Sequence, residues 1–130
     1  VYINNKGVII MSWNKHSAVT FARQHAHQQS THFCARAVAA AIRAGGIQIE
    51  GANAMNFDRS LERAGFRQVY GEPMEGDVAV ISALPGPHQY GHTCIYDGMG
   101  TWYSDFIQRS MYPGPHYREL HPAFKLYRHN

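Results

Sequence analysis

The chain has 130 residues, of which 45% are hydrophobic and 16% are charged, and its formal net charge is +3. This length fits one domain that buries its own core without a metal or a disulfide staple. No run of about 18 apolar residues occurs, which argues against a membrane span, and no block of about five basic residues marks a nucleic-acid partner. The mild positive charge suits an anionic polymer.

The first ten residues, VYINNKGVII, lack the basic start, long apolar middle and cleavage site of a signal peptide. The chain begins with Val1, and its first methionine is Met11. We therefore expect Met11 to be the natural start, with residues 1–10 added in cloning or read from the upstream frame. Residues 11–130 are expected to form a single domain.

Helices are expected in the first half of the chain. Residues 14–27 follow helical spacing without an interrupting Gly or Pro. A second helix is expected to begin at an N-cap formed by Ser30 or Thr31, to run through CARAVAAAIRA and to end at a glycine pair. Residues 53–64 predict a third helix.

Short strands separated by Gly and Pro are expected after these helices, at 66–70, 77–82, 92–96, 101–106 and 124–128. The Pro-rich and Gly-rich segments 84–91 and 112–122 are expected to be loops. Helices followed by strands predict an α+β domain whose N-terminal helices pack on a small antiparallel sheet.

Cys34 is the first candidate for chemistry, since it falls in the first turn of the second helix whichever residue caps it. Unpaired N–H groups and partial positive charge at a helix N-terminus stabilise a thiolate and lower its pKa. The same N–H groups can hold the oxyanion of an acyl-transfer intermediate. The alternative is a small buried hydrophobic residue, the commonest fate of a free cysteine.

His92 opens the strand HTCIY, and Asp97-Gly98-Met99-Gly100 is the expected turn to the next strand. In that register Tyr96 faces Thr101 and His92 faces Asp105. The carboxylate of Asp105 would then orient the imidazole and aim its other nitrogen at the nucleophile. A bulge would shift this register, and the alternative is an exposed histidine near an unrelated aspartate.

Several further side chains have either a functional or a structural interpretation. Cys94 is either a small core residue or the partner of Cys34 in a disulfide that silences the nucleophile. No histidine spacing resembles a zinc motif, so no metal is expected. The substrate-binding candidates lead into the expected active strand or lie on its neighbour, although aromatic residues in such positions are more often core: His88, Gln89, Tyr90 and Trp102.

The segments STHFCARAVAAAIRAGG, GDVAVI, GHTCIYDG and WYSDF resemble the CHAP and NlpC-like branch of papain-fold peptidoglycan hydrolases. In that family the cysteine attacks an amide bond of the stem peptide or cross-link, and the histidine activates it. The resemblance implies these roles for Cys34 and His92 and the orienting role for Asp105. The family often places Asn, Glu or a second His in this third position.

The segment WYSDFIQRSMYPGPHYR and the compact format are similar to amidase effectors of the type VI secretion system. Such effectors are made in the cytoplasm without a signal peptide, act in the periplasm of a rival bacterium and are neutralised by a cognate immunity protein. A phage endolysin catalytic domain shares the core motifs and is the alternative within this fold.

The leading hypothesis is a monomeric peptidoglycan amidase or endopeptidase that uses a cysteine, a histidine and an aspartate. It needs no metal or organic cofactor and involves neither nucleic acid nor a membrane. A papain-like toxin acting on a protein, as a protease or deamidase, is a second hypothesis. A binding module without catalysis is a third. The residues leave open which wall bond is cut.

Overall fold

The computed structural model describes residues 2–3, 5–7, 9–10, 12–86 and 90–130. Its helices are α1 (Lys15–His25), α2 (Cys34–Ala44), the 3₁₀ turn η1 (Ala54–Asn56), α3 (Phe57–Arg63) and α4 (Pro115–Leu120). Its strands are β1 (Tyr2–Ile3), β2 (Ile9–Ile10), β3 (Arg67–Val69), β4 (Val78–Ile81), β5 (His92–Tyr96), β6 (Trp102–Tyr103), β7 (Ile107–Gln108) and β8 (Phe124–Arg128).

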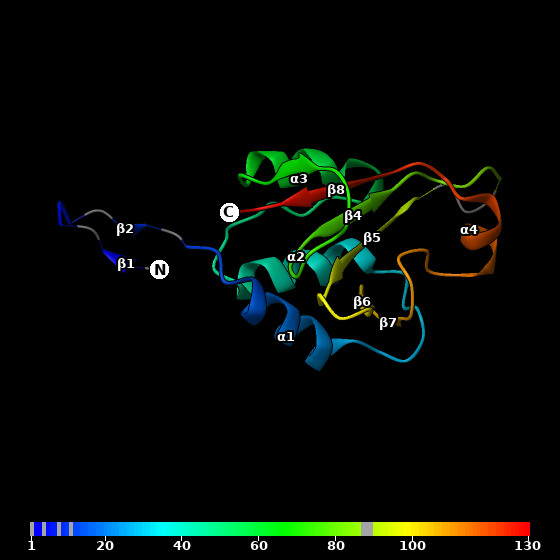
Figure 1. The fold of residues 1–130 in the computed structure, drawn as a ribbon, viewed down its shortest axis with the longest axis horizontal. Coiled ribbons are helices and arrows are strands. Elements are labelled where there is room, and N and C mark those ends of the chain that lie inside the picture. The colour runs from blue at the N-terminus through cyan, green and yellow to red at the C-terminus, as the bar shows by residue number, and fades with distance from the viewer. Residues whose placement is uncertain (1, 4, 8, 11, 87–89) are drawn as a thin grey trace.

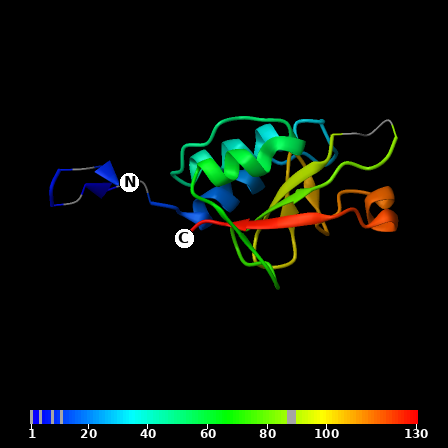
Figure 2. The ribbon, with the colours of Figure 1, turned by 90° about the horizontal axis from the view of Figure 1, so that it is seen from above.

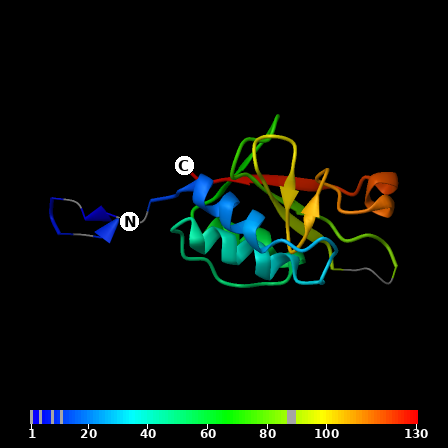
Figure 3. The ribbon, with the colours of Figure 1, turned by 90° about the horizontal axis from the view of Figure 1, so that it is seen from below.

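A six-stranded antiparallel sheet with the order β3-β8-β4-β5-β6-β7 organises the described part of the chain. Helices α1 and α2 lie side by side along one face of this sheet, as the two turned views in Figure 2 and Figure 3 show. Helix α4 lies at the end of the sheet away from the chain termini, and the β1–β2 hairpin stands apart from the body (Figure 1). The α+β prediction, with helices packed on an antiparallel sheet, is confirmed.

Two clusters of buried side chains lie on the two faces of the central strands, because successive strand residues point to opposite faces. On the helical face, Val38 and Ile42 of α2 pack in the same cluster as Val78 and Ile95 of the sheet. The other face carries a smaller cluster: Ala79, Ile81, Cys94, Trp102 and Leu126. His92, two residues before Cys94, therefore belongs to the face opposite the helices.

The ends of α1 and α2 follow from local chemistry. The side chain of Asn14 caps α1 by accepting the N–H of Ser17 at 2.9 Å. Helix α2 ends at Gly45, and Gly46 follows with φ of 97°, a left-handed conformation that glycine adopts without steric cost. At its start, however, the N-cap is Phe33, which makes no side-chain cap bond, so the predicted caps Ser30 and Thr31 were wrong.

Other differences from the expected elements cluster in the second half of the chain. The strand expected at 101–106 is shorter, and β7 follows it after a bend. The segment 112–122 contains α4, which begins with Pro115 at a position where its missing N–H has no helical partner to lose. The prediction that residues 1–10 precede the natural start stays a prediction.

Candidate active site

Cys34 is the first residue of α2, and its sulfur is half-buried where this helix meets β5. Three backbone amides near the sulfur favour its charged form and lower the pKa: those of Thr93, Ala35 and Cys34 itself. Burial nevertheless raises the pKa of Cys34 above its ordinary value, because the cost of desolvating a thiolate exceeds the gain from these amides. The amides at the helix N-terminus lower this pKa as expected, but burial outweighs them and the net shift is upward.

His92 is buried on β5, and its Nε2 lies 2.8 Å from Oε1 of Gln108. The amide nitrogen of Gln108 donates to the carbonyl oxygens of Ser110 at 3.2 Å and Met111 at 3.1 Å, which fixes its oxygen toward the imidazole. Because an amide oxygen only accepts, Nε2 of His92 carries the proton and Nδ1 keeps its lone pair. Gln108 thus selects the tautomer whose Nδ1 can take a proton.

Burial also sets the charge of this imidazole. It lowers the pKa of His92 below the ordinary 6.5, although the bond to Gln108 and the charge of Asp105 both oppose this change. The two pKa shifts together favour the uncharged forms of both side chains, a neutral imidazole and a neutral thiol. A neutral imidazole can accept a proton at Nδ1, which is what a general base requires.

The sheet register does not place Asp105 opposite His92. Strand β5 pairs Ile95 with Tyr103 and Tyr96 with Trp102, one residue beyond the expected register. The turn is longer than expected, because Asp97 N donates to the carbonyl of Thr101 at 3.0 Å. The ladder then ends at Tyr103, and the predicted pairing of His92 with Asp105 was wrong.

The carboxylate of Asp105 instead bonds the loop before α2. Its Oδ2 accepts from Thr31 N at 2.5 Å, from the Thr31 hydroxyl at 2.7 Å and from Phe33 N at 3.5 Å. Burial raises the pKa of Asp105, but these hydrogen bonds outweigh burial and hold the pKa below its usual value. Asp105 is therefore an ionised carboxylate in the wall between the loop and β7.

A cleft of about 600 Å³ contains both Cys34 and His92. Its other lining residues come from the loop before α2, the segment before β5, the bend after β6 and the start of α4: Ser30, His32, Leu84, Tyr90, Gly91, Phe106, Pro113, Gly114, Pro115, His116 and Tyr117. The ring of His92 lies 6.2 Å from that of Phe106 and 6.3 Å from that of Tyr117. The predicted nucleophile and base thus share one open site.

The predicted substrate-binding residues divide between this cleft and the core. Tyr90 is exposed and lines the cleft, and its role in substrate binding stays a prediction. Trp102 does not line the cleft. Its side chain lies in the buried cluster on the sheet face opposite the helices, with its ring 4.5 Å from the ring of Tyr96. His88 and Gln89 lie outside the described residues.

Solved structures with similar folds identify the family. A chain in the crystal structure of the type VI native effector–immunity complex Tae3–Tai3 from Ralstonia pickettii is 42% identical, with a TM-score of 0.85, over 91% of this chain and 100% of that one. The chain belongs to the Tae3 family of type VI effectors. A selenomethionine form of the complex matches at 44% identity and a TM-score of 0.80, over 85% of this chain and 98% of that one. No protein-family model and no curated protein matches.

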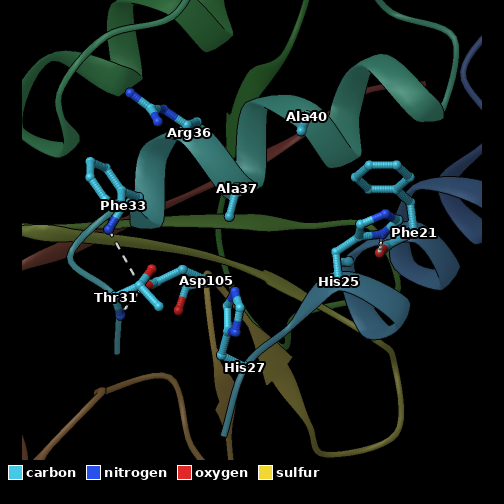
Figure 4. A pocket seen from close by; sticks show the side chains of 11 residues that line it. Phe21, His25, His27, Thr31, Phe33, Arg36, Ala37, Ala40 and Asp105 are labelled. Atoms are coloured by element: carbon cyan, nitrogen blue, oxygen red, sulfur yellow. Dashed lines mark hydrogen bonds between the residues drawn. The ribbon is translucent and has the colours of Figure 1, made fainter. Parts of the chain in front are cut away.

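Outside the cleft, this Tae3-family chain has a second hollow of about 290 Å³ between α1, α2 and the intervening loop. Figure 4 shows Phe21 and His25 at one end, Phe33 and Arg36 at the other, and Asp105 between Thr31 and His27. The hollow contains neither Cys34 nor His92. Asp105 thus lies between the hollow and the loop that leads to Cys34.

The described part of this Tae3-family chain was also compared with the expectations for metal sites, membrane helices and Cys94. Within it, no cluster of His, Cys, Asp or Glu side chains has the arrangement of a metal site. No helix in that part is long and apolar enough to cross a membrane. Cys94 is a free, fully buried thiol that donates to the carbonyl of Met111 at 3.6 Å, on the sheet face away from α2.

Proposed function

We propose that this Tae3-family protein is a cysteine amidase that cleaves an amide bond of peptidoglycan, in the stem peptide or the cross-link. The main support for this proposal is that Cys34 and His92 line the same cleft, with the proton of His92 held on Nε2 by Gln108. The effector family supports the substrate, since Tae denotes amidase effectors. The narrower CHAP or NlpC resemblance remains a prediction.

The reaction begins with the neutral pair. As Cys34 Sγ attacks the amide carbonyl carbon, Nδ1 of His92 takes the thiol proton, and the imidazolium is stabilised through Nε2–H by Oε1 of Gln108. In this mechanism the developing oxyanion accepts from amides at the N-terminus of α2, those of Cys34 and Ala35. Collapse of the tetrahedral intermediate breaks the C–N bond, and His92 returns its proton to the leaving amine.

Hydrolysis of the thioester completes the cycle. A water attacks the acyl carbon while Nδ1 of His92 accepts one of its protons, and the C–S bond breaks to release a carboxylic acid. The sulfur recovers the proton from His92. No step requires a metal or an organic cofactor.

The setting of this activity follows from the family. The solved relatives are effector–immunity complexes, so we propose that a cognate immunity protein also neutralises this chain. The protein would act in the periplasm of the target cell after secretion. The net charge of +3 favours contact with an anionic wall.

The test is digestion of purified Gram-negative sacculi, with released muropeptides identified by mass spectrometry. The wild type is expected to release new fragments, and Cys34→Ala to lower their rate by more than about 1000-fold. Cys94→Ala, which removes the other thiol, is the matched control and is expected to keep the rate within about tenfold, since Cys94 contacts Gln108 but does not line the cleft. Fragments from Cys34→Ala at the wild-type rate would contradict the proposal, as would intact sacculi with every protein.

A further inference from the structure

The loop that leads from α1 to Cys34 is fastened at its start to the bend between β6 and β7. The amide of His27 donates to the carbonyl of Asp105 at 2.8 Å, and the amide of Ile107 donates to the carbonyl of His27 at 3.1 Å. These bonds make a parallel bridge between His27 and Phe106. The loop therefore starts from a position set by the backbone of the bend.

The end of the same loop is fastened by a side chain. One carboxylate oxygen of Asp105 accepts from both the amide and the hydroxyl of Thr31 and, at longer range, from the amide of Phe33. Phe33 immediately precedes Cys34, so these bonds reach to within one residue of the nucleophile. Asp105 is itself only 4% exposed and has little freedom to follow a shifted loop.

Between these two bonded residues the backbone adopts an unfavourable conformation. His32 has φ of 67°, in the left-handed region that costs a non-glycine residue free energy. Such a conformation persists only where the surroundings hold the chain on both sides. The amides on either side of His32 are the two that Asp105 bonds, so its carboxylate holds the loop in this shape.

We propose that Asp105 is a positioning residue for the nucleophile: its carboxylate holds Thr31 and Phe33 so that Cys34 enters α2 facing His92. This rests on the proposed function of Cys34. The role differs from that of a triad aspartate, which orients the base. Here Gln108 bonds the base and Asp105 bonds the nucleophile's loop, and the two side chains leave the same bend three residues apart.

Two substitutions separate positioning from charge. Asp105→Ala removes both the acceptor and the charge, whereas Asp105→Asn removes the charge and keeps an oxygen that accepts from Thr31 and Phe33. Asp97→Ala is the matched control. Asp97 is also a buried carboxylate, accepting from Met99 N at 2.7 Å and Thr101 N at 3.0 Å, but it caps the β5–β6 turn away from the cleft.

The kinetic readout is turnover of muropeptides isolated from sacculi. Asp105→Ala is expected to lower kcat about 100-fold with KM within about threefold, as for a misplaced reacting group. The kcat of Asp105→Asn should be higher than that of Asp105→Ala and within about tenfold of wild type. Asp97→Ala should lower the melting temperature as Asp105→Ala does and leave kcat within about twofold.

A second readout needs no wall substrate, so failure of the proposed function would not hide the result. Alkylation of Cys34 by iodoacetamide is expected to be faster in Asp105→Asn than in Asp105→Ala by about fivefold or more, because the two lack the same charge and differ in loop geometry. Equal alkylation rates in these two variants would overturn the proposal. So would equal losses of kcat, which would assign the role to charge alone.

Discussion

Strand β5 and the bend from Ser104 to Gln108, whose strand β7 is separated from β5 by β6, are held in different ways. Strand β5 is paired along four residues with β4 and at two with β6, and it is buried over nearly its whole length. The bend leaves the ladder after Tyr103 and returns as a two-residue strand. Its position depends on a backbone bridge to His27 and on the side chains of Asp105 and Gln108.

This difference bears on the placement of Cys34 and His92, the proposed nucleophile and base. Backbone ladders position His92, and those bonds do not depend on side-chain identity. Its tautomer and the approach of Cys34 depend on two polar side chains of the bend. Substitutions in the ladder should therefore affect stability first, whereas substitutions in the bend should affect catalysis first.

The largest expected effect is on the reactivity of the Cys34 thiol, which lies near backbone amides of both β5 and α2. Because burial raises the pKa of Cys34 above its ordinary 9.0, its thiolate fraction at pH 7 should be below about 1%. The alkylation rate by iodoacetamide should thus still be rising at pH 9, measured in a Cys94→Ala background that leaves one thiol. A profile with its midpoint below pH 7 would mean that the helix N-terminus and His92 together outweigh burial.

A smaller effect is expected from the side chain of Trp102, whose backbone pairs with that of Gln108 but whose indole lies in the buried cluster. Trp102→Leu should lower the free energy of unfolding by about 2–3 kcal/mol, since the indole packs on Tyr96 in the buried cluster. Its kcat/KM should stay within about twofold of wild type. Tyr90→Ala is the comparison: it should raise KM about threefold without changing the unfolding midpoint, because Tyr90 is exposed on the cleft wall.

An increase in KM with Trp102→Leu and none with Tyr90→Ala would contradict this division. It would return Trp102 to the substrate-binding role that the sequence suggested.

The sequence predicted well those elements whose bounds depend on residues within the same segment. The bounds of β5 and β8 agree with the expected 92–96 and 124–128, because alternation between Gly and Pro breaks is a property of the segment itself. Cys34 fell in the first turn of its helix as expected, and the structure brings it into one cleft with His92. The prediction that Cys34 and His92 lie together came from the resemblance to papain-fold hydrolases as well as from the spacing of the elements.

Long-range side-chain bonds were not predictable in the same way. The turn after β5 is closed by Asp97 and Thr101, and the resulting shift of one residue removes Asp105 from His92. Gln108 was missed because β7 is too short to alternate and its partner lies sixteen positions earlier. Nothing in the residues after Gln108 indicated that the carbonyls of Ser110 and Met111 would orient its amide.

The central claim is that Gln108 orients His92 and Asp105 does not. Nitrogen NMR of the His92 imidazole tests it directly, in wild type, Gln108→Ala and Asp105→Ala. We expect the Nε2–H tautomer in wild type and in Asp105→Ala. In Gln108→Ala this tautomer should be lost or mixed, with kcat lowered about 10- to 100-fold by loss of the bond to the imidazolium. A tautomer that survives in Gln108→Ala and is lost in Asp105→Ala would contradict the account.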